Sequence, residues 1–79
     1  MDDEVIARIN ALVEEEHALA RALEGRGATA DDKARLRELE VALDQCWDLL
    51  RQRRARREFG EDPSTAEVRP GDVVEGYRQ

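Results

Sequence analysis

The feature that most constrains this chain is a pair of helical apolar patterns separated by two glycines, Gly25 and Gly27. In residues 2–25, apolar side chains recur at steps of three or four, with Glu16 at the single polar step. The members of this first stripe are Val5, Ile9, Leu12, Leu19 and Leu23. Such spacing is typical of one face of an amphipathic helix, so this stretch is predicted to be helical.

A second stripe follows a short connector and predicts a second helix over about residues 30–58. Thr29 is a suitable N-cap, and Asp32 three residues later completes a pattern resembling a capping box. The apolar residues of this stripe are Leu36, Leu39, Leu43, Cys46 and Leu50. Because the connector spans only residues 25–29, the two helices are expected to lie side by side and antiparallel.

Residues 60–79 differ in composition from the helical segments, because they contain both prolines and show no helical period. We expect them to be an extended or flexible C-terminal tail that follows a helical hairpin at residues 1–59. The predicted fold class is therefore all-α. It consists of one antiparallel, coiled-coil-like two-helix hairpin with a tail, in a chain long enough for a single small domain.

The two apolar stripes are wider than one helix pair can cover, because Ile6, Val13, Trp47 and Leu49 extend them sideways. Each large apolar side chain left in water forgoes roughly 1.5–3 kcal/mol of burial free energy. A second hairpin packed face to face would complete a four-helix bundle, so we expect a homodimer. The residues expected at its interface are Leu12, Leu19, Leu43, Trp47 and Leu50.

Several features indicate a cytoplasmic protein without a membrane partner. The chain begins Met1-Asp2-Asp3-Glu4, which lacks the basic and apolar regions of a signal peptide. Its longest apolar runs are far too short to span a membrane. Its single cysteine, Cys46, allows no intrachain disulfide and fits a reducing compartment.

A basic cluster ends the second helix, although the formal net charge of the chain is −6. Its members are Arg51, Arg53, Arg54, Arg56 and Arg57. Clustered arginines neutralise phosphates, which favours a surface that binds nucleic acid or an acidic protein. In an antiparallel hairpin, however, this cluster would lie beside the acidic residues 2–4, and structural charge pairing is the favoured interpretation.

Glu14 and His17 form a Glu-x-x-His step, the spacing found in di-metal carboxylate helical bundles. A homodimer would supply the second copy of the motif. Both residues lie off the apolar stripe, at positions expected to face water. A solvated acidic face is therefore the favoured interpretation, and we predict neither a metal site nor a cofactor.

The run Leu-Asp-Gln-Cys-Trp-Asp-Leu-Leu-Arg-Gln-Arg-Arg-Ala at residues 43–55 resembles a family of short uncharacterised actinobacterial proteins, a domain of unknown function. The opening residues 2–23, with a Val-x-x-Glu-His core, and the ending residues 73–77 are similar too. The resemblance spans nearly the whole chain. It implies a compact single-domain protein and carries no activity, cofactor or site.

The sequence therefore favours an interaction or adaptor protein without catalytic activity. The surfaces expected to meet an unknown protein partner are the basic cluster and three tail residues, Val73, Val74 and Tyr77. The first alternative is a nucleic-acid-associated protein that uses the basic cluster. The second alternative is a di-metal bundle that uses Glu14 and His17.

Overall fold

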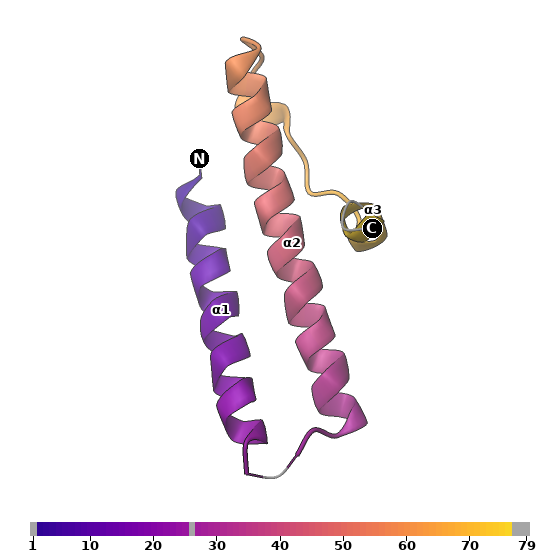
Figure 1. Cartoon of the computed structure of the whole chain (residues 1–79). Coiled ribbons are helices and arrows are strands. Elements are labelled where there is room, and N and C mark those ends of the chain that lie inside the picture. The colour runs from indigo at the N-terminus through magenta and orange to yellow at the C-terminus, as the bar shows by residue number, and fades with distance from the viewer. Residues whose placement is uncertain (1, 26, 77–79) are drawn as a thin grey trace.

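The computed structural model describes residues 2–25 and 27–76, and every regular element in this part of the chain is helical (Figure 1). The two long helices run side by side and antiparallel, and the third helix contacts the second one from another side. The all-helical class and the packing of the long helices are thus confirmed. The elements are α1 (Asp3–Leu23), α2 (Ala30–Glu58), the 3-10 helix η1 (Pro63–Thr65) and α3 (Gly71–Gly76).

Helix α1 begins after Asp2, whose side chain makes no capping bond with the backbone. The Asp2 carboxylate instead accepts hydrogen bonds from Arg53 and Arg57 near the end of α2. At the other end of α1, the Gly27 amide donates to the Leu23 carbonyl at 3.0 Å. Gly27 has a φ of 72°, a left-handed conformation that glycine adopts at little cost, and this turn ends the helix.

The start of α2 is fixed by the predicted capping box. The Thr29 hydroxyl accepts from the Asp32 amide at 3.1 Å, and the Asp32 carboxylate accepts from the Thr29 amide at 3.1 Å. Two of the backbone donors that a helix N-terminus leaves without intrahelical partners are therefore satisfied. The helix ends at Glu58, and Gly60 then turns the chain with a φ of 72°.

The C-terminal segment (residues 60–76) is not simply extended, so the prediction of an extended tail is wrong for two short stretches. Pro63–Thr65 form η1, where the Asp62 carboxylate accepts a hydrogen bond from the Ser64 amide at 2.9 Å. Gly71–Gly76 form α3. Elements of three and six residues are too short to give an apolar period, which is why pattern analysis missed them.

The core lies between α1 and α2, with one contribution from the C-terminal segment. Partly buried side chains of both long helices surround a small buried cluster. The buried members are Val5, Ile9, Leu49 and Ala66. Because Ala66 lies beyond η1, the C-terminal segment completes the core of the hairpin and is not an independent appendage.

Helix α3 approaches α2 closely at Gly71. A β-carbon at this position would lie only 2.6 Å from Cγ1 of Val41, so a glycine is needed for the contact. Val74 of α3 is 3% exposed. The short helix is therefore docked through one buried valine and one close backbone approach.

The molecule is elongated and thin. Its extents are 51 × 26 × 14 Å, and its radius of gyration of 15.0 Å exceeds the roughly 12 Å expected for a compact domain of this length. The smallest extent is little more than one helix diameter of about 10–12 Å, so the hairpin is a single layer with two broad faces. Over the described residues, each helix is too short or too polar to cross a membrane.

We expect Gly71→Ala to lower the free energy of unfolding by about 1–3 kcal/mol, because the new methyl group would overlap Val41. Urea unfolding followed by circular dichroism measures the change. Gly25→Ala is the matched control, since nothing lies within 4 Å of a β-carbon there, and it should change stability by less than about 0.5 kcal/mol. Wild-type stability in both variants would contradict the packing of α3 on Val41.

Candidate functional site

The basic cluster meets the N-terminus of α1, as the charge-pairing interpretation predicts. Arg53 lies 3.3 Å from Asp2 and 3.1 Å from Glu4, and its side chain is only 12% exposed. Arg57 lies 3.2 Å from the other oxygen of Asp2. These ion pairs join the start of α1 to the end of α2 at the open end of the hairpin. The partial burial of Arg53 shields its contacts from solvent.

The other arginines of the cluster are more exposed. Arg54 pairs with Glu58 one turn later at 3.1 Å, and Arg56 pairs with Glu61 at 3.3 Å. Arg51 is exposed on the surface of α2. Much of the positive charge of the cluster is therefore balanced within the chain, and Arg51 and Arg54 are the members most accessible to a partner.

An ion pair between Arg69 and a buried carboxylate, that of Asp48, holds the C-terminal segment against α2. Asp48 is 1% exposed, and its carboxylate accepts two hydrogen bonds from Arg69, one of them from Nε at 2.9 Å. These bonds lower the pKa of Asp48 below its ordinary value, and they outweigh burial, which alone would raise it. Gln52 donates a further hydrogen bond to the same carboxylate at 2.9 Å. The carboxylate therefore stays ionised inside the fold.

Polar side chains of α2 also bind the backbone of the C-terminal segment. Gln52 donates to the Glu67 carbonyl at 2.7 Å, and Gln45 donates to the Arg69 carbonyl at 3.1 Å. Asp48 lies between these two glutamines on the same face of α2. This face gives no apolar signal in the sequence, because its spacing of three and four residues is carried by polar side chains.

The three tail residues expected to bind a partner differ in position. Val74 is buried at 3% exposure, so its side chain is not available to a partner in this fold. Val73 is 44% exposed. Tyr77 lies outside the described residues. In the described part of the tail, Val73 is therefore the residue of this set that remains on the surface.

The C-terminal segment packs along α2 on the side away from α1, and its residues Ala66 and Val68 reach the seam between the two long helices at one broad face of the hairpin (Figure 1). Beside it lies a pocket of about 330 Å³ that is lined by all three parts of the chain, including Arg8 of α1, Cys46 and Leu49 of α2, and Val68. Leu49 is 7% exposed because this side of α2 is closed by the chain itself. The expectation that both flanks of the hairpin need a second copy is therefore wrong for the Leu49 flank.

The opposite broad face is open and is centred on Trp47, which is 49% exposed. A pocket of about 420 Å³ beside the indole is lined by Glu16 of α1 and by residues of α2. The residues of α2 in its wall are Glu40, Leu43, Asp44 and Trp47. This pocket lies on the seam between the two long helices, like the previous one, but on the side that the C-terminal segment does not reach.

Ile6 and Val13 of α1 extend this face. They are seven residues apart and so share one side of the helix, and Val13 lies one turn before Glu16. Ile6 is 47% exposed and Val13 is partly buried. We call the surface formed by Ile6, Val13, Leu43 and Trp47 the open face.

The expected interface residues are only partly on this surface. Leu12 is 2% exposed inside the hairpin, so it is removed from the expected interface. Leu19, Leu43 and Leu50 are partly buried between the helices, where their edges remain accessible. Trp47 is the member of the set that presents a large exposed apolar surface.

The possible metal ligands do not converge. Glu14 and His17 are both exposed on α1. Among residues 2–25 and 27–76, no group of three or more histidine, cysteine or carboxylate side chains is arranged to hold a metal ion. Cys46 is a free thiol whose pKa is raised by burial, which disfavours the thiolate needed of a nucleophile.

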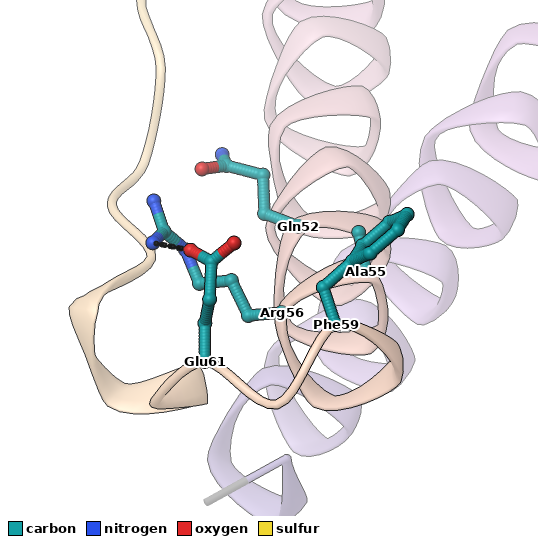
Figure 2. Close-up of a pocket in the computed structure, with 5 residues that line it drawn as sticks. All are labelled: Gln52, Ala55, Arg56, Phe59 and Glu61. Carbon is teal, nitrogen blue, oxygen red and sulfur yellow. Dashed lines mark hydrogen bonds and ion pairs between the residues drawn. The ribbon is translucent and has the colours of Figure 1, made fainter.

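A third pocket, of about 250 Å³, lies at the end of α2 (Figure 2). Its walls are Gln52, Ala55, Arg56, Phe59 and Glu61. Figure 2 shows the phenyl ring of Phe59 against Ala55, apart from the Arg56–Glu61 ion pair. Phe59 is 79% exposed and lies beyond the last apolar position of the α2 stripe, so the helical pattern predicts no role for it.

Comparison of the sequence with known proteins places the chain in a family. A family model described as "Protein of unknown function (DUF2630)" matches residues 1–79. The chain belongs to this family. Uncharacterized proteins from Mycobacterium bovis and from two strains of Mycobacterium tuberculosis are each 53% identical over 77 residues, covering 96% of this chain and 88% of the relative.

No solved structure matches the chain. The resemblance to a short family of unknown function is thus confirmed, and the names of these DUF2630 relatives assign no activity, ligand or partner.

We expect Asp48→Asn to lower the free energy of unfolding by about 1–3 kcal/mol at pH 7, because it removes the charge that binds Arg69. Since the pKa of Asp48 is lowered by folding, its contribution is complete above the unfolded pKa of about 3.9 and is lost as the pH falls through the folded value. The difference between wild type and variant should therefore shrink below about pH 4. Urea unfolding from pH 7 to pH 3 measures it.

Glu58→Gln is the control for this experiment, because it removes an ion pair whose side chains are 60% and 78% exposed. Such a pair contributes less than about 1 kcal/mol. A wild-type advantage over Asp48→Asn that stays constant between pH 7 and pH 3 would refute a stabilising role for the Asp48 charge.

Proposed function

We propose that this protein is a non-catalytic helical interaction protein that acts as a homodimer through its open face. The observation that carries the proposal is the half-exposed indole of Trp47 on the face that the C-terminal segment leaves uncovered. Tryptophan is enriched among the residues that dominate protein interfaces. Trp47 and Ile6 are already about half buried, so covering the rest against a second copy would contribute about half of the roughly 1.5–3 kcal/mol that full burial of a large apolar side chain gives.

The exposed area of the chain supports a partner of this kind. The surface area is 5529 Å², whereas a compact monomer of 9.0 kDa is expected to expose roughly 4,900 Å². A standard protein interface buries about 800 Å² on each side. A single-layer hairpin that meets a second copy on its open face would bury an area of this order and form two layers, which is the usual architecture of a small domain.

The proposed dimer is a four-helix bundle in which the C-terminal segments lie on the outside. They pack along the side of each α2 that faces away from α1, and Ala66 and Val68 reach the hairpin face that points away from the interface. The surfaces left for a different protein partner are then the exposed end of α2, with Phe59, and the exposed Val73 of α3. This assignment corresponds to an adaptor, and the single free thiol, Cys46, agrees with a place in the reducing cytoplasm.

Nucleic-acid binding has less support. Arg53 and Arg57 contact carboxylates of α1, so a phosphate would have to compete with Asp2 for both of them. A di-metal bundle also has less support, because Glu14 and His17 are exposed and no group of three or more ligand side chains is arranged to hold a metal ion among residues 2–25 and 27–76.

We expect Trp47→Ala to convert the dimer to a monomer with unchanged helicity, because the residue is exposed in the single chain and needed only in the dimer. Sedimentation equilibrium measures the association, and circular dichroism measures the helicity. Phe59→Ala is the matched control. It removes a more exposed aromatic ring from outside the open face and should leave the dissociation constant unchanged.

Trp47 is the only tryptophan, so its fluorescence reports on the same interface. Its emission should shift to shorter wavelength as the concentration of wild-type protein rises, because the indole leaves water. A wild-type protein that stays monomeric at high micromolar concentration would refute the proposal. Equal weakening of the dimer by Phe59→Ala would place the interface elsewhere.

A further inference from the structure

The open face carries a stripe of α2 in which charge is arranged in a definite order. Residues on this stripe are separated by steps of four and three, so they share one side of the helix. In chain order they are Glu40, Asp44, Trp47, Arg51 and Arg54. The half before Trp47 is acidic and the half after it is basic.

The charge of the side chains on this stripe changes from negative to positive at Trp47. Glu40 lies seven residues before the indole and Arg54 lies seven residues after it, which is about 10 Å in each direction along the helix axis. Both side chains are exposed. Farther out the signs change again at both ends of the stripe, with Lys33 before Glu40 and Glu58 after Arg54.

Helix α1 adds to the acidic half. Glu16 lines the pocket beside Trp47 together with Glu40 and Asp44, so three carboxylates border the indole on this side. Neither Arg51 nor Arg54, which form the basic half of the stripe, lines this pocket. The pocket therefore favours a cationic group, and the indole face can contribute a cation–π contact to it.

A two-fold dimer brings the same patch of both copies together. If two α2 helices crossed in parallel at Trp47, Glu40 would face Glu40 and Arg54 would face Arg54. If they ran antiparallel, Glu40 of each copy would face Arg54 of the other, and Arg51 would enter the acidic pocket of the other copy. Like charges that face each other at an interface disfavour association, so only the antiparallel arrangement is complementary.

We infer that the occupant of the open face is a second copy of this chain, docked antiparallel about a two-fold axis at Trp47, with Glu40 of each copy paired to Arg54 of the other. The inference rests on the proposed homodimer and adds its register. In the single chain Arg54 pairs with Glu58, but both side chains are more than half exposed, and so weak a pair can be exchanged on docking. The charges on the open face then select the antiparallel over the parallel arrangement of the two copies.

Charge reversal tests the register. Glu40→Arg alone and Arg54→Glu alone each place two like-charge contacts in the antiparallel dimer, one on each side of the axis. Each should weaken dimerisation about tenfold or more, as measured by sedimentation equilibrium. The double variant Glu40→Arg with Arg54→Glu recreates both pairs with exchanged signs, so its dissociation constant should return close to that of the wild type.

The matched controls are Glu14→Arg and Arg21→Glu, which make the same changes of net charge at exposed positions of α1 away from the open face. They should leave dimerisation unchanged, and circular dichroism should show wild-type helicity for all variants. If the wild type dimerises while the single and double variants associate equally well, the register is wrong and the proposed homodimer stands. If the wild type is monomeric, both proposals fail.

Discussion

Burying the carboxylate of Asp48 in the middle of α2 requires a cation, and the chain supplies one from Arg69, twenty-one residues later. The cost of removing this carboxylate from water is recovered only when its remaining hydrogen-bonding positions are satisfied, and Gln52 helps to satisfy them. This requirement ties the C-terminal segment to one side of α2. Helix α1 covers another side of α2. Two sides of α2 are therefore covered, and the side that bears Trp47 is left open.

The sequence was informative where one physical signal dominates. The apolar stripes at steps of three and four predicted both long helices, and Gly27 and the Thr29–Asp32 capping box explain where the chain turns between them. The meeting of the arginines with Asp2 and Glu4 followed from antiparallel geometry alone. These features are local or depend on a single pairing of two helices, so little tertiary information is needed to predict them.

The rest depended on polar contacts between distant residues. Nothing in the spacing of Gln45, Asp48 and Gln52 shows that they bind backbone and side-chain groups near Arg69. For the same reason, the burial of Val74 and the closure of the Leu49 flank were missed. Of the residues expected at an interface, Trp47 is half exposed, whereas Leu12 is buried inside the hairpin, and its burial could be known only from the packed structure.

Amide hydrogen exchange measured residue by residue tests the central claim that the C-terminal segment is docked on α2. The structure gives the amides of Ala66, Val73 and Val74 carbonyl partners at 3.1–3.2 Å. The account predicts that these amides exchange much more slowly than in an unstructured peptide, and that protection is greatest in the middle of α2. Exchange of all three at the rate of an unstructured chain, with α1 and α2 still protected, would contradict it.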